Sequence, residues 1–207
     1  MTSPLLIRHA ETDMAGRFCG HCDPELNERG RRQLSGLVSA LSGHAIGRVY
    51  TSDLRRARQT AEAVAKHFRA ELQVRPGLRE IHFGLWEGLS WSEIEVRDPA
   101  LASKWLKDYP NSTAPGGESF HNFERRVRKE IAFLLEEATP APIAAVGHAG
   151  FIRVALMTHG NLSEREAWDQ TKDYGSVVAL EVFPTSRTGS ETSVRSALKA
   201  YRKGALT

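Results

Sequence analysis

Short apolar runs alternating with amphipathic stretches are the feature that most constrains how this chain folds. Leu5–Ile7 and Ile143–Val146 are continuous apolar runs of strand length, and Arg48–Thr51 indicates another strand. Such runs are typical of strands buried on both faces of a parallel sheet. Between them, apolar residues recur with helical spacing across 34–41 and 54–68. This order predicts an α/β fold, a three-layer α/β/α sandwich with a mostly parallel central sheet, and 207 residues favour a single domain over 1–207.

The stretch at about 76–118 breaks this alternation. It holds three of the four tryptophans, together with several helix-breaking prolines: Trp86, Trp91, Trp105, Pro99, Pro110 and Pro115. We expect it to form a cap-like insertion of short helices over one edge of the sheet. A long helix should follow, with Ser119 as its N-cap. Two late strands, at 177–183 and 194–201, are expected at a sheet edge and antiparallel.

Two histidines directly follow predicted strands. His9 comes after the first strand and His148 after the run at 143–146. Small residues follow each histidine, Ala149 among them, so a ligand could approach the backbone there. Since ligands bind outside the carboxyl ends of strands in α/β sheets, we expect both imidazoles and the neighbouring Arg8 at one rim.

Arginines open the helix that follows the strand ending at Thr51. Arg55, Arg56 and Arg58 lie in its first turns, with Thr51 or Ser52 as the expected N-cap. Backbone N–H groups at a helix N-terminus and guanidinium forks both donate to an oxyanion, so this end of the helix is a candidate phosphate site. The three arginine side chains cannot all point at one ligand, and Arg55 and Arg58 are expected to be solvated.

At this point the chain resembles the histidine phosphatase superfamily, in its phosphoglycerate-mutase-like branch, with members such as α-ribazole phosphatases and broad-specificity phosphatases. The family motifs occur in the family order, at Arg8–Thr12, Asp23–Gly30, Ser52–Ala61, Leu78–Gly88, Pro115–Ser119 and Gly147–Gly150. One motif alone would be weak evidence, whereas the ordered set, from residue 7 to about 150, is specific.

The resemblance implies a role for each matching residue. Arg8, Arg56 and His148 would surround the phosphate, His9 would attack phosphorus, and Glu80 would donate the proton. Two arginines and a histidine can neutralise a phosphate monoester without a metal, so neither a metal nor another cofactor is expected. A neutral His9 imidazole could form a phosphohistidine, with its second nitrogen held by a backbone carbonyl.

The sequence departs from the family pattern at two positions. Ala10 stands where glycine is usual, and Ala15 stands where an asparagine often touches phosphate. A backbone N–H near Cys19 or Gly20 could replace that donor. Cys19 and Cys22 form a Cys-x-x-Cys pair in an expected loop, with no second pair of soft ligands for zinc, so we interpret them as plain thiols in a binding loop.

Three functions compete: a phosphomonoesterase for a small phosphorylated metabolite, a phosphoglycerate mutase, and a phospho-ligand binding module without turnover. Ile81 stands where mutases place an arginine, and the long mid-chain insertions of mutases are missing, which favours the phosphatase. The presence of every expected catalytic residue disfavours the binding module. Substrate choice should come from the cap and loop 13–23, with His21, His82, Trp86, Trp105 and Tyr109 as candidates.

Composition limits the partners. Basic residues number 28 and acidic residues 25, a balance that argues against nucleic-acid binding. The apolar stretch at the N-terminus is too short for a signal peptide or a membrane span, so we expect no membrane partner and a cytoplasmic location. The late edge strands could pair between subunits, which leaves a homodimer open.

Overall fold

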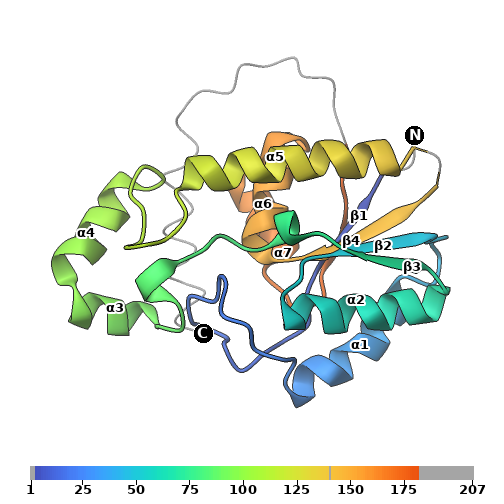
Figure 1. Cartoon of the computed structure of the whole chain (residues 1–207), viewed down its shortest axis with the longest axis horizontal. Helices are drawn as coiled ribbons and strands as arrows, with labels where there is room; N and C mark the ends of the chain where they lie inside the picture. The colour runs from blue at the N-terminus through green and yellow to red at the C-terminus, as the bar shows by residue number, and fades with distance from the viewer. Residues whose placement is uncertain (1–2, 140, 182–207) are drawn as a thin grey trace.

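The computed structural model describes residues 3–139 and 141–181. A five-stranded sheet lies between its helices (Figure 1). Its strand order is β3-β2-β4-β1-β5. Four strands run parallel, while β5 is antiparallel to β1 at one edge. The strands are β1 (Leu5–Arg8), β2 (Arg48–Thr51), β3 (Glu71–Val74), β4 (Ile143–Gly147) and β5 (Val177–Ala179).

Helices cover both faces of this sheet. Helices α1 (Glu28–Ala40) and α2 (Arg55–Phe68) lie on one face, and α5 (Phe120–Glu137) and α6 (Ala149–Thr158) on the other (Figure 1). Successive residues of β1 point to opposite layers: Leu5 and Ile7 pack in the core with α1 and α2, and Leu6 packs in the core with α5 and α6. The predicted three-layer α/β/α sandwich is therefore confirmed.

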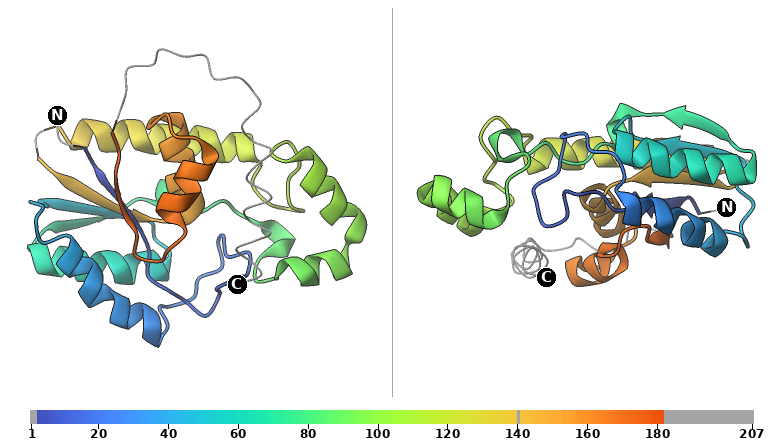
Figure 2. Two further views of the ribbon diagram at one scale, coloured as in Figure 1. Left: turned by 180° about the vertical axis from the view of Figure 1, so that it is seen from behind. Right: turned by 90° about the horizontal axis from the view of Figure 1, so that it is seen from below.

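The excursion at 76–118 holds two single-turn 3-10 helices, Pro76–Leu78 and Gly84–Trp86, and the helices α3 (Trp91–Arg97) and α4 (Pro99–Asp108). Helices α3 and α4 project beyond the end of the sheet (Figure 2). Their inner faces form a separate buried cluster with Phe18, which lies in the first loop, the segment 9–27 between β1 and α1. The buried members of this cluster are Phe18, Phe83, Trp86, Ile94, Ala102, Trp105 and Ala114. Ring contacts among Phe18, Trp86 and Trp105 at 5.5–6.0 Å hold this cluster together.

Helix caps follow the sequence rules in some places and not in others. Ser119 caps α5, because its side chain accepts a hydrogen bond from the Asn122 N–H. The expected cap of α2 at Thr51 or Ser52 is wrong: Leu54 is the N-cap residue and makes no side-chain cap bond. Ser52 is instead hydrogen-bonded to His148.

Two elements were not expected from the sequence, the edge strand β3 and helix α7 (Glu164–Thr171), which packs beside α6. The strand expected at 177–183 appears as β5, antiparallel to β1 at the sheet edge. The strand expected at 194–201 lies outside the described residues. Among the helices that the structure describes, none combines the length and apolar character that a membrane span requires.

Candidate active site

His9 and His148 meet at the carboxyl edge of the sheet. They directly follow β1 and β4, which are parallel neighbours with Arg8 in register with Gly147. The ring centroids lie 5.1 Å apart, and the two side chains are 8% and 1% exposed, so both rings are buried together. The sequence expectation that these two imidazoles share one rim agrees with this geometry.

One nitrogen of the His9 ring is fixed by the backbone. Nδ1 lies 2.7 Å from the carbonyl oxygen of Ala10, which can only accept a hydrogen bond, so Nδ1 carries the proton. In the neutral ring, Nε2 then keeps its lone pair. The Ala10 N–H in turn donates to Oγ1 of Thr60 at 3.1 Å, which fixes the peptide beside the ring.

His148 is the N-cap residue of α6 and is oriented from β2. Its Nε2 lies 2.8 Å from Oγ of Ser52, the residue after β2. Its Nδ1 is buried and has no hydrogen-bond partner among the described residues, and the same is true of Nε of Arg56. Buried polar atoms are normally hydrogen-bonded, so a polar ligand in this site could supply the hydrogen-bond partners that these two atoms lack.

Arg56 enters this site from the first turn of α2 and is fully buried. Its guanidinium donates to three carbonyl oxygens of the first loop: Nη1 to Cys22 at 2.6 Å, and Nη2 to Gly20 at 2.8 Å and to Cys19 at 3.2 Å. Its neighbours behave as expected for solvated residues, because Arg55 pairs with Glu25 and Arg58 with Glu62 near the surface.

Arg8 is held by the segment that follows α7. Its Nη1 donates to the carbonyl oxygens of Thr171 and Lys172 at 2.9 and 2.6 Å, and its guanidinium lies 4.0 Å from the centroid of the Tyr174 ring. The same tyrosine ring lies 5.6 Å from the His9 ring. This segment therefore forms one wall of the site, and nothing in its sequence had indicated that.

Glu80 is fixed against the N-terminus of α6. Its Oε2 accepts from the Gly150 N–H at 2.8 Å, and its Oε1 accepts from the Ile81 N–H at 3.0 Å. A Cβ on residue 150 would lie 2.3 Å from Oε1, so only glycine allows this approach. Glu80 is 9% exposed and thus sits at the buried rim next to the His148 segment.

Burial and positive charge keep both histidines neutral. The pKa of His9 is lowered well below 6.5, first by burial and then by Arg56 and Arg8. The pKa of His148 is likewise lowered, by burial first and then by Arg56, His9 and Arg8. The site thus combines two neutral imidazoles with two fixed guanidinium cations, a set that suits an anion with several oxygens.

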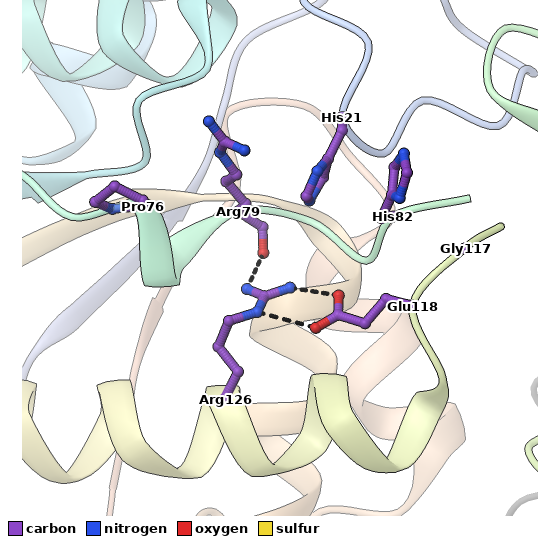
Figure 3. Close-up of a pocket in the computed structure, with 7 residues that line it drawn as sticks. All are labelled: His21, Pro76, Arg79, His82, Gly117, Glu118 and Arg126. Carbon is purple, nitrogen blue, oxygen red and sulfur yellow. Dashed lines mark hydrogen bonds and ion pairs between the residues drawn. The ribbon is translucent and has the colours of Figure 1, made fainter. Parts of the chain in front are cut away.

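A pocket of about 350 Å³ adjoins this rim, shown in Figure 3. Its lining is His21, Pro76, Arg79, His82, Gly117, Glu118 and Arg126. The rings of His21 and His82 lie side by side with centroids 4.6 Å apart, and Nε2 of His21 is 3.1 Å from the Glu80 carbonyl oxygen. His21 and His82 therefore line a pocket beside the Glu80 backbone. Of the other candidates, Trp86 and Trp105 are buried in the aromatic cluster, and Tyr109 is partly buried against it.

One of the two backbone N–H groups expected to replace an asparagine donor at position 15 already has a partner within the protein. The Gly20 N–H already donates to Oε2 of Glu87 at 3.0 Å. Cys19 and Cys22 are free thiols with their sulfur atoms 3.1 Å apart.

Ala149 is the first residue of α6, beside His148. Among residues 3–139 and 141–181, no group of three or more His, Cys, Asp or Glu side chains could hold a metal ion.

Sequence reasoning missed Ser52, Tyr174 and Glu87. Ser52 follows a strand just as His9 and His148 do, so the same strand-end rule could have found it. Glu87 lies inside the Leu78–Gly88 motif, but its partners come from the distant first loop. Tyr174 lies outside the family motifs and does not follow a predicted strand, so neither rule indicated it.

Comparison with known proteins defines the class. A family model described as histidine phosphatase superfamily (branch 1) matches residues 5–191. The chain therefore belongs to the histidine phosphatase superfamily, as the ordered motifs predicted.

Individual relatives include named phosphatases. The chain is 37% identical over 158 residues to the bifunctional protein Rv2228c of Mycobacterium tuberculosis, a match that covers 75% of this chain and 43% of that protein. It therefore spans less than half the length of that relative. It is 30% identical over 179 residues to the adenosylcobalamin/alpha-ribazole phosphatase of Escherichia coli, covering 86% and 88% of the two chains. The crystal structure of the alpha-ribazole phosphatase from Shigella flexneri superposes with a TM-score of 0.75 at 28% identity, covering 91% of this chain and 98% of that one.

Proposed function

We propose that this chain is a metal-independent phosphomonoesterase that hydrolyses a small phosphorylated metabolite through a phosphohistidine on His9. The observation that carries the proposal is the Nδ1 contact of His9 with the Ala10 carbonyl, which leaves Nε2 as the free nucleophile beside His148. The relatives named as phosphatases support the same reaction class.

In the first step, Nε2 of His9 attacks phosphorus, and the P–O bond to the leaving group breaks. Arg8, Arg56 and His148 bind the phosphoryl oxygens, whose charge shifts during the transfer. Glu80 gives its proton to the leaving oxygen. The leaving alcohol departs with that proton, and the phosphoryl group stays on His9.

In the second step, water attacks the phosphohistidine. Glu80, now a carboxylate, takes a proton from this water, and the P–N bond breaks. The products are inorganic phosphate and the starting enzyme, with Glu80 protonated again. Splitting the hydrolysis in this way replaces one difficult displacement by two easier ones.

The leaving group would occupy the pocket beside Glu80. His21 and His82 line it, and His21 lies 3.1 Å from the backbone carbonyl oxygen of Glu80, so they would contact whatever the phosphate is attached to. The name of the Escherichia coli relative makes α-ribazole phosphate one compound to include in a substrate screen.

The test compares the purified chain with His9→Ala, in EDTA, on an aryl phosphate. Steady-state release of phosphate and alkaline-quench trapping of phosphoprotein are measured together, because the P–N bond of a phosphohistidine is labile in acid. Turnover with a trapped phosphohistidine, both lost in His9→Ala, is the expected result. No turnover on aryl phosphate but transfer between phosphoglycerates would favour a mutase instead, and phosphate binding without either reaction would favour a binding module.

A further inference from the structure

The side chain of Glu87 accepts four backbone hydrogen bonds. Its Oε2 accepts from the N–H groups of Gly20 and Cys22, both at 3.0 Å. Its Oε1 accepts from the N–H groups of His21 at 2.7 Å and Phe83 at 2.9 Å. One carboxylate thereby fixes three consecutive residues of the first loop and ties them to the segment after Glu80.

The same loop residues face Arg56 with their carbonyl groups. The peptide between residues 19 and 20 presents its C=O to Arg56 and its N–H to Glu87. The next peptide does the same, with the Gly20 carbonyl on Arg56 and the His21 N–H on Glu87. Because the C=O and N–H of a trans peptide point in opposite directions, each unit is a dipole aligned between a carboxylate and a guanidinium.

We propose that Glu87 is a positioning residue that acts through these peptides to fix the guanidinium of Arg56 for phosphate binding. The inference rests on the proposed function, since it gives Arg56 a phosphate to bind. It assigns a role to a residue in the cap excursion that does not itself touch the phosphate.

The local chemistry supports a role for the charge of Glu87. Burial would raise the pKa of this carboxyl group, but the hydrogen bonds from His21, Cys22 and Phe83 outweigh burial and lower it. Glu87 is thus ionised at neutral pH. Residue 20 must also be glycine, because a Cβ there would lie 2.1 Å from the Ile81 carbonyl oxygen and 2.5 Å from Oε1 of Glu87.

Glu87→Gln keeps the shape but replaces one accepting oxygen by an amide that donates. At least one set of loop N–H groups then loses its partner, the loop shifts, and the carbonyls that orient Arg56 move with it. In metalloproteins, mutating a residue that only orients a metal-binding side chain typically lowers the metal affinity about 10–100-fold. By analogy, we expect Glu87→Gln to weaken the binding of inorganic phosphate by a similar factor of about 10–100.

The experiment measures inorganic phosphate affinity by calorimetry, the KM and kcat on aryl phosphate, and the alkylation rates of Cys19 and Cys22. The variants are Glu87→Gln, Arg56→Met and the double variant, with Asp98→Asn as matched control. Asp98 is also a cap carboxylate that accepts a backbone N–H, from Leu101 at 3.0 Å, and this contact lies within the cap. Glu87→Gln should weaken phosphate binding, raise KM more than it lowers kcat and speed alkylation, while Asp98→Asn leaves all three unchanged.

The double variant decides whether Glu87 acts through Arg56. In the Arg56→Met background, adding Glu87→Gln should cost less than about 2-fold, because coupled residues are not additive. Phosphate affinity unchanged in Glu87→Gln, or full additivity with Arg56→Met, would overturn the inference. If Glu87→Gln does not fold, Glu87→Asp replaces it, and wild-type phosphate affinity in that shortened variant would count against the inference. A wild type that neither binds phosphate nor turns over would instead overturn the proposed function.

Discussion

The carboxyl edge of the sheet and the cap excursion contribute to the site in different ways. At the sheet edge, His9, Ser52 and His148 each follow a strand, so the backbone ladder fixes where the side chains start. In the cap, position depends on side chains: an aromatic cluster shapes it, and the ion pair of its Glu118 with Arg126 of α5 lines the adjoining pocket. The groups assigned to chemistry thus lie mainly on the rigid part, and those assigned to recognition on the part held by side-chain packing.

This difference predicts that damage to the sheet edge removes activity on every substrate, whereas damage to the cap redistributes activity among substrates. Glu80 and Glu87 lie in the excursion but are hydrogen-bonded to α6 and to the first loop, so they join the two regions.

The largest effect is expected from Arg56→Met. Loss of the buried cation that we propose to bind the phosphoryl group should lower kcat/KM by about 10³-fold, roughly 4 kcal/mol, equally for all phosphomonoesters. Steady-state kinetics on three unrelated substrates measure this. Arg55→Met, one residue away and paired with Glu25 at the surface, is the control and should stay near wild type. A strongly substrate-dependent loss in Arg56→Met would blur the division between the two regions.

Trp105→Ala should lower the free energy of unfolding of the cap by about 3 kcal/mol, because it opens a cavity in the aromatic cluster. Hydrogen exchange should then rise in α3 and α4 while the sheet amides stay protected. Leu134→Ala, on the buried face of α5 in the main core, is the comparison and should lower protection throughout the chain. Equal loss of protection in sheet and cap for both variants would mean that the two regions unfold as one.

His82→Ala should change kcat/KM by about 10–200-fold, in different directions for different leaving groups, because a pocket contact is worth about 1–3 kcal/mol. Substrate panels compared with wild type provide the measurement. His121→Ala, on the exposed surface of α5, serves as the control. A uniform loss on every substrate would move His82 from recognition to the chemical step.

The smallest effect is a shift of the acid limb of kcat/KM. Since burial, Arg56 and Arg8 lower the pKa of His9, its ring stays neutral well below pH 6.5, and activity should persist there. As pH falls through the lowered pKa, His9 gains a proton and the rate drops. Arg56→Met removes one lowering cause, so its acid limb should lie at higher pH than in the wild type with the same substrate. An unshifted limb would argue that another group controls it.

Periodicity predicts the parts of the molecule that are buried on both sides. The runs at β1 and β4 were readable because every residue is apolar, and they placed His9 and His148 correctly at one rim. The edge strand β3 has two exposed ends and a polar residue, Gln73, between apolar ones, so its pattern is weak. Helix α7 also has few apolar residues, so its helical pattern is weak too.

The contacts that escape sequence reasoning join segments far apart in the chain. Local rules predict that Ser52 caps the helix that follows it, yet its hydroxyl is hydrogen-bonded to His148, which follows the neighbouring strand. Glu87 meets its N–H donors only after the first loop folds under the cap. Such pairings depend on the tertiary path, which a single sequence does not reveal.

The place of β1 in the sheet has a consequence for how the chain is made. In the described sheet, its two neighbours are β4 and β5, which begin at Ile143 and Val177. During synthesis at about 5–20 residues per second, the first strand therefore waits several seconds for any partner. A nascent or truncated chain that stops before β4 lacks the strand beside His9 as well as His148 itself. The site around the proposed nucleophile, His9, is thus assembled late although His9 is translated early, and fragments of this protein should be inert as phosphoryl acceptors.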